Sequence, residues 1–282
     1  MNEGEWSEMS LIVLCSASGS PGVTTAALGL ALTWPRPVLL VEADPTGGSA
    51  VLAGYFRGQV TPPGTMLDLA FAHRTGTLTD AIPRLAMRIP DTDVTFLPGL
   101  LSHGQARSVE ALWEPLAAAL TSMNSLGQDV LVDAGRLGLT GSPEPLLNAA
   151  DLCLLVSRTD LVSLAGARSW AQTLRTGFEE RGAGGALALL PVGPGRPYTP
   201  REVAKVLRVP VLASLAWDEP GAAVFSRGAP RPRRWERSPL PTSLRAAGDA
   251  ARTRIGRAIA DLQPGSAGSG PDAGHIPAGE RA

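Results

Sequence analysis

The chain has 282 residues and a formal net charge of −1, with 44% hydrophobic and 18% charged residues. That length suits one large α/β domain or two small ones, with ample material for a core. The near-neutral charge excludes a general attraction for nucleic acid or for an anionic membrane. Cys15 and Cys153 both lie in apolar runs and are expected to be buried thiols, so neither a disulfide framework nor a cysteine-based metal site is indicated.

No apolar run approaches the roughly 20 residues that a membrane-spanning helix needs. The first residues, including Asn2, Glu3 and Glu5, are polar and acidic, unlike a secretory signal. We therefore expect no transmembrane segment and a cytoplasmic location.

Short apolar runs alternate along the chain with longer segments of helical period. The first run, at 11–15, is followed by a Gly/Ser loop and an apolar helix from about Thr24 to Trp34, which two prolines end. Further strands are expected at 38–41, 94–97, 130–132, 152–156, 186–190 and 211–213. Continuous apolar strands are typical of a sheet that is buried on both faces. The pattern predicts a doubly wound, mostly parallel α/β sheet with helices on both faces.

The last helix is expected from about Ser243 to Leu262, with an apolar stripe that packs on the sheet; a helix lying on a membrane surface is the alternative. Residues 263–282 are rich in Gly, Ser and Pro, so a disordered tail is expected there. The predicted organisation is an N-terminal extension at 1–9, one domain at 10–262, and this tail.

The loop between the first expected strand and the first helix is rich in glycine and serine. Residues 17–25 read Ala-Ser-Gly-Ser-Pro-Gly-Val-Thr-Thr. They resemble the deviant P-loop of the ParA/MinD family, in which a lysine, two glycines, a variable residue, a glycine, a lysine and two threonines follow in order. Ser18 and Val23 stand at the two lysine positions of that pattern, and Ser20 stands at a glycine position. The residues that match it are Gly19, Gly22, Thr24 and Thr25.

Two acidic motifs follow at strand ends. Glu42-Ala43-Asp44-Pro45 resembles the second motif of the family, which implies that Asp44 positions water near the γ-phosphate and Mg²⁺. Asp133-Ala134-Gly135 after an apolar run has the form of a Walker B strand, and the resemblance implies that Asp133 holds Mg²⁺ through water. The alternatives are a turn-forming Asp-Pro and an ordinary strand-end aspartate.

The resemblance extends over residues 10–262, because further segments follow in the family's order at 66–70, 78–82, 96–99, 210–218 and 225–228. It implies a nucleotide site at Gly19, Ser20, Gly22, Val23, Thr24 and Thr25. The implied Mg²⁺ ligands are Thr24, Asp44 and Asp133.

The departures from the family pattern weaken the expected chemistry. A P-loop aims backbone N–H groups and a helix N-terminus at the phosphates, while lysine neutralises their charge. Val23 supplies no charge, the only lysine of the chain is Lys205, and Pro21 lacks an N–H group. Losing one preorganised donor commonly lowers a rate by ~10²–10³. We therefore expect weak Mg-ATP binding at most, without brisk hydrolysis.

Arginine could in principle replace the missing lysines, although surface or structural roles are the alternative. The candidates, judged by their nearness to strand ends, are Arg136, Arg158 and Arg196. Residues 190–195 also lack the asparagine that commonly reads adenine in the family.

Lysine-poor P-loops on this fold resemble the TadZ/CpaE branch, which places tight-adherence pilus machinery and works beside a secretion ATPase. The run at 64–69 also resembles that branch, which usually carries an N-terminal receiver-like domain; only about ten residues precede the first strand here. The resemblance implies a homodimeric localisation or assembly scaffold, recruited peripherally to a membrane or pole complex, with a secretion or pilus ATPase or another assembly protein as its partner.

The competing interpretation is an active or weak ParA-like ATPase for DNA or cargo partition. Its DNA-facing surface would be the segment 227–237, in which four arginines surround Trp235 among prolines. The alternative for this segment is a solvated loop that packs Trp235 against the domain, and on that basis nucleic acid is not expected as a partner. A dethiobiotin-synthetase-like enzyme shares the fold but needs its P-loop lysines.

Overall fold

The computed structural model describes residues 10–122 and 127–262, and within them seven strands form one sheet. The predicted N-terminal extension and C-terminal tail lie outside the described residues. The sheet order is β3-β4-β2-β5-β1-β6-β7, and each neighbouring pair is parallel except β3 and β4. The strands are β1 (Leu11–Ser16), β2 (Val38–Glu42), β3 (Met87–Arg88), β4 (Val94–Leu97), β5 (Asp129–Arg136), β6 (Leu152–Arg158) and β7 (Leu187–Val192).

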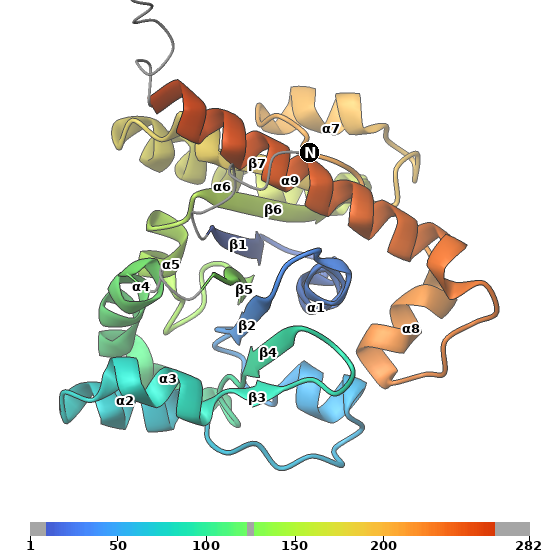
Figure 1. Ribbon diagram of the computed structural model, residues 1–282. Helices are drawn as coiled ribbons and strands as arrows, with labels where there is room; N and C mark the ends of the chain where they lie inside the picture. The colour runs from blue at the N-terminus through green and yellow to red at the C-terminus, as the bar shows by residue number, and fades with distance from the viewer. Residues whose placement is uncertain (1–9, 123–126, 263–282) are drawn as a thin grey trace, which may run out of the picture.

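Helices cover both faces of this sheet, as the continuous apolar strands predicted (Figure 1). Alternate residues of each central strand enter two separate cores. One core lies between the sheet and helices α2 to α7, and the other between the sheet and α1, α8 and α9. The helices are α1 (Val23–Thr33), α2 (Met66–Arg74), α3 (Leu78–Leu85), α4 (Trp113–Ser122), α5 (Glu144–Asn148), α6 (Leu161–Glu180), α7 (Pro200–Leu207), α8 (Glu219–Arg227) and α9 (Pro239–Leu262).

Shorter helical turns connect these elements: a π-helical turn at Val51–Tyr55 and 3₁₀ turns at His103–Leu112, Gly184–Ala186 and Trp235–Arg237. Cys15 and Cys153 are free, buried thiols on the neighbouring strands β1 and β6, with their sulfur atoms 4.0 Å apart. The expectation of core thiols is confirmed.

The strand expected at 211–213 was wrong. That segment makes only isolated bridges to β7, one of them between Leu189 and Val211. The hydrogen bonds of Leu189 begin a parallel ladder with Pro210 and Leu212. The next residue of β7 that would donate to this segment is Pro191, which has no N–H, so the ladder is interrupted there. Pairing resumes where the Leu215 N–H donates to the Pro191 carbonyl oxygen.

The last helix packs on the molecule as predicted, and it begins four residues earlier than expected, at Pro239. Proline suits the first helical position because its missing N–H would have no intrahelical partner. Leu244 is fully buried against Gly29 of α1, where an added Cβ would lie 2.6 Å from the leucine. Glycine in α1 therefore lets α9 approach closely. Among the described helices, none is long and apolar enough to cross a membrane.

Candidate functional site

The loop between β1 and α1 is wound through left-handed backbone conformations. Gly19, Ser20 and Gly22 have φ values of 76°, 44° and 91°, a region that glycine enters without strain and serine rarely adopts. Gly22 is the N-cap of α1, and no described side chain caps that end. The N–H groups of the first turn of α1, which carry the positive end of the helix dipole, are therefore available to an anion.

The two positions at which the resemblance places lysines are occupied by packed, uncharged side chains. Val23 is only 7% exposed and belongs to the core beneath α1. The Ser18 hydroxyl lies 3.5 Å from the carbonyl oxygen of Ser163 in α6, and a Cβ on Gly166 would lie 2.3 Å from this hydroxyl. Ser18 thus lies against α6 of its own chain and brings no charge to the loop.

The predicted acids lie close to Thr24, in the first turn of α1. Strands β2 and β5 are neighbours, with Glu42 opposite Asp133 in register. Asp44 lies against Gly135, where an added Cβ would be 2.2 Å from the carboxyl carbon. Only glycine leaves room for Asp44 there. The structure therefore brings Asp44, Asp133 and Thr24 together, and it adds Glu42.

Asp133 is buried and incompletely satisfied. Its Oδ1 accepts a hydrogen bond from the Gly135 N–H at 3.0 Å, whereas its Oδ2 has no hydrogen-bond partner among the described residues. Burial raises the pKa of Asp133 to about 7, against the opposing effect of the nearby Thr24 hydroxyl, and the charges of Glu42 and Asp44 raise it further. Burial also raises the pKa of Glu42, which accepts a hydrogen bond from the Gly99 N–H at 3.1 Å.

A small cavity adjoins these acids, and we call it the carboxylate pocket. Its volume is about 30 Å³, which is room for one water or one ion. It is lined by Thr24, Glu42, Asp44, Thr46, Gly47, Ser49, Ala50 and Leu100.

Hydroxyl and carboxylate oxygens suit Mg²⁺, and the unpartnered Oδ2 of Asp133 fits a hydrated cation. In the described part of the chain, no three His, Cys, Asp or Glu side chains converge as a metal site. A magnesium ion held here would therefore draw most of its ligands from water and from a bound anion.

A larger cavity, which we call the Trp217 pocket, also adjoins the α1 N-terminus and shares no lining residue with the carboxylate pocket. Its volume is about 180 Å³, and its lining is mostly apolar. It is lined by Ser20, Pro21, Gly22, Thr25, Ala26, Arg158, Val192, Leu215, Ala216, Trp217, Asp218, Glu219, Ala222 and Leu240.

The three candidate arginines fall in different places. Arg158, at the end of β6, lines the Trp217 pocket, with its guanidinium 5.4 Å from the centre of the indole ring and its Nη2 3.5 Å from the Ser20 carbonyl oxygen. Arg196 lies 5.2 Å from the same ring but outside the pocket lining, and Arg136 is exposed at the end of β5. Of the three arginines, only Arg158 both lines the pocket and contacts the loop at 17–25.

The sequence did not predict some residues of the site, because their roles depend on packing. Glu42 was part of a quoted motif, and its burial beside Asp133 follows from strand register. Trp217 and Asp218 belong to a segment that resembled the family, but nothing in their local sequence predicts a pocket wall. Asp218 is largely structural, since its carboxylate accepts hydrogen bonds from the backbone N–H groups of Gly221 and Leu240.

No family model matches the chain. The uncharacterized protein Rv3660c of Mycobacterium tuberculosis strain H37Rv is 30% identical over 237 residues, which cover 84% of this chain. The uncharacterized protein MT3760 of strain CDC 1551 matches to the same extent. The chain spans 62% of the length of each of these curated relatives.

Solved structures resemble the chain over nearly their whole length. The cell division ATPase MinD of Pyrococcus furiosus has a TM-score of 0.66 at 20% identity, covering 87% of this chain and 99% of that one. A ParA family ATPase from Chlorobium tepidum has a TM-score of 0.66 at 17% identity, over 86% and 98% of the two chains. MinD of Pyrococcus horikoshii, complexed with Mg-ADP, has a TM-score of 0.64 at 19% identity, over 86% and 96%. The chain therefore has the fold of the MinD and ParA ATPases.

Proposed function

We propose that this protein is a ParA/MinD-like protein with impaired catalysis that serves as a localisation or assembly scaffold. The observation that carries the proposal is the burial of Val23 at the position of the P-loop lysine. Phosphoryl transfer relies mostly on positioning and on positive charge near the γ-phosphate oxygens. Residues 17–25 contain no cation, and the neighbouring carboxylate pocket adds acids.

Weak binding of a Mg-nucleotide is part of this proposal. The Pyrococcus horikoshii MinD structure contains Mg-ADP, and the chain described here retains the wound loop, the open N-terminus of α1 and the acids. These parts favour anion and Mg²⁺ binding even without lysine. These features favour binding of a Mg-nucleotide without efficient hydrolysis of ATP.

We further propose a homodimer that works beside an assembly partner, with a TadZ/CpaE-type pilus or secretion system as the specific setting. The MinD of Aquifex aeolicus is solved in complex with MinC, so this fold supports partner binding. Cytoplasmic residence with peripheral recruitment to a membrane or pole complex follows from the same proposal.

Nucleotide-independent assembly is the expected behaviour of such a scaffold. Ser18 is short and uncharged and lies against α6 of its own chain, so it offers a second subunit no charged group as a signature lysine would. The mass measured by light scattering should be the same with and without Mg-ATP. A dimer that forms only when Mg-ATP is added would contradict this expectation.

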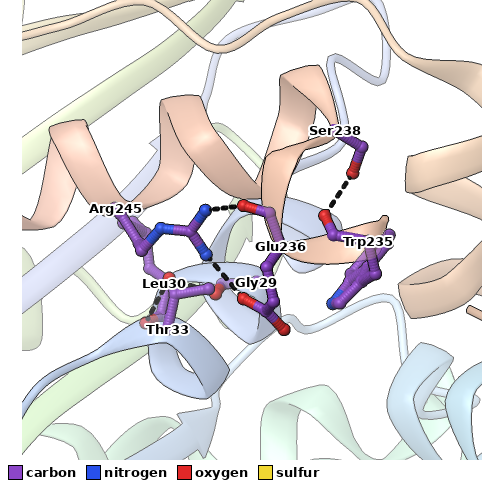
Figure 2. A network of polar contacts seen from close by, with 7 residues as sticks. All are labelled: Gly29, Leu30, Thr33, Trp235, Glu236, Ser238 and Arg245. Atoms are coloured by element: carbon purple, nitrogen blue, oxygen red, sulfur yellow. Dashed lines mark hydrogen bonds and ion pairs between the residues drawn. The ribbon is translucent and has the colours of Figure 1, made fainter. Parts of the chain in front are cut away.

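A partition ATPase is the second candidate, and one observation favours it. Arg231, Arg233, Arg234 and Arg237 are exposed, and none has an ion-pair partner in the described ranges. Figure 2 shows how this loop is fixed: Arg245 of α9 donates hydrogen bonds to the carboxylate and the carbonyl oxygen of Glu236. Glu236, the one acid of this loop, is therefore paired with Arg245 of α9 and does not neutralise the loop arginines.

Trp235 of this loop is buried and lies 5.4 Å from the ring centre of Phe225, as the solvated-loop interpretation predicted. The exposed arginines still permit phosphate contacts.

The scaffold proposal predicts no mobility shift of duplex DNA at physiological salt. A shift that disappears in the double variant Arg233→Gln/Arg234→Gln but persists in Arg201→Gln, a surface control on α7, would favour partition instead.

A further inference from the structure

The two pockets that flank the N-terminus of α1 differ in size and in charge. The Trp217 pocket, at about 180 Å³, has an indole wall and is mostly apolar, so it has room for a planar ring. The carboxylate pocket, at about 30 Å³, has room only for an ion or a water. The ring of a ligand that also carries a phosphate chain would therefore fit beside Trp217 and not in the carboxylate pocket.

Arg158 is the one cation among the residues that line the Trp217 pocket. The two acids of that lining already accept hydrogen bonds, Asp218 from the N–H groups of Gly221 and Leu240 and Glu219 from the indole N–H of Trp217. Arg158 lines the Trp217 pocket together with Ser20 and Gly22 of the P-loop. Its Nε is buried without a hydrogen-bond partner among the described residues, and its Nη2 reaches the Ser20 carbonyl oxygen only at 3.5 Å, the long limit of a hydrogen bond. Arginine presents a fork of donors that matches phosphate oxygens. The Arg158 guanidinium can therefore donate further hydrogen bonds beside the loop at 17–25.

Acids gather at the carboxylate pocket, where the far end of a phosphate chain would lie. Glu42 and Asp44 line the carboxylate pocket, and Asp133 adjoins it, whereas no lysine or arginine belongs to its lining. Each additional phosphate brings more negative charge toward these acids, which is unfavourable unless a cation intervenes.

We infer that this site selects a nucleoside diphosphate over the triphosphate, with Arg158 as the cation that holds the phosphates. The inference rests on the proposed function and deepens it, since it names the nucleotide state that a non-hydrolysing scaffold would retain. The terminal phosphate of a triphosphate gains no partner of opposite charge from the protein, and it meets carboxylates instead.

Isothermal titration with ADP and with ATP, each in EDTA, tests the inference. The wild-type chain should bind ADP at least about tenfold more tightly than ATP. Arg158→Ala should weaken ADP binding about tenfold, and Arg158→Lys should restore part of the loss. Arg136→Ala is the matched control, because it removes an arginine from the end of β5, another parallel strand of the same sheet, outside both pocket linings; its ADP affinity should stay within about twofold.

Asp44→Asn supplies a second test that does not depend on Arg158. In EDTA it should tighten ATP binding several-fold and ADP binding by a smaller factor, because the terminal phosphate of ATP would lie nearer to this carboxylate. Equal or tighter binding of ATP by the wild type, no binding of ADP, or equal losses in Arg158→Ala and Arg136→Ala would each overturn the inference. The scaffold proposal has its own tests, which are ATP hydrolysis, a dimer that forms only with Mg-ATP and a DNA shift that depends on Arg233 and Arg234; a failure to bind ADP would remove only its weak-nucleotide part.

Discussion

Replacing Val23 with lysine is expected to raise the affinity for Mg-ATP at least about tenfold, equivalent to about 1.4 kcal/mol. The new ammonium group would belong to the first residue of α1, at the open helix N-terminus and next to Thr24, which lines the carboxylate pocket. The same change should lower the free energy of unfolding by about 1–3 kcal/mol, because it inserts a longer, charged side chain at a position that is only 7% exposed.

Calorimetric titration and urea unfolding measure the two effects separately. Val23→Met is the matched control, since it lengthens the side chain without adding charge and should leave Mg-ATP binding unchanged. Equal affinities in Val23→Lys and the wild type would show that charge at this position is not what the site lacks.

Replacing Asp133 with asparagine is expected to stabilise the ligand-free chain by about 1–3 kcal/mol at pH 8. The carboxyl is fully buried and its Oδ2 has no partner in the described residues, while Glu42 and Asp44 lie nearby. Asparagine keeps the shape and removes the charge. The change should therefore relieve the repulsion among the acids.

The effect should depend on pH in a defined direction. The pKa of Asp133 is raised from 3.8 to about 7, so the folded state favours the protonated form. Its contribution to stability is complete below about pH 4 and is lost as the pH rises through 7. The gain in Asp133→Asn should accordingly be larger at pH 8 than at pH 5, measured by unfolding in EDTA.

Asp129→Asn is the contrasting control. Asp129 is also buried, but its carboxylate accepts hydrogen bonds from the Ser10 N–H and the Trp34 indole N–H and lies 3.7 Å from Arg36. Its charge is compensated, so its removal should destabilise the chain. Similar stabilisation in both variants would show that the missing hydrogen-bond partner of Asp133 is not the cause of its effect.

The sheet could be predicted from sequence because its strands are apolar on both faces, a pattern that few other structures produce. The succession of strand, glycine loop and helix at 11–34 could be predicted for a related reason, because all three are consecutive in the chain. Where prediction went wrong, at 211–213, the run itself looked like a strand. The obstacle, Pro191, lies in the neighbouring strand and acts only once the two segments are paired.

The site was only partly predictable. Asp44 and Asp133 end apolar strands, so the parallel topology alone brings them to one edge. The Trp217 pocket, in contrast, draws its lining from the P-loop, the end of β6 and the segment before α8, which are far apart in sequence. That Arg158 alone of three candidate arginines reaches the P-loop follows from packing, and no local signal separates it from Arg136 or Arg196.

Phosphate release in a single turnover tests the central claim most directly. With protein in excess over radiolabelled Mg-ATP, weak affinity does not mask the chemical step, and the uncharged P-loop predicts release no faster than in a protein-free blank. Release that clearly exceeds the blank, and that disappears in Asp44→Ala, would contradict the account, because it would show that this pocket supports γ-phosphate transfer without lysine.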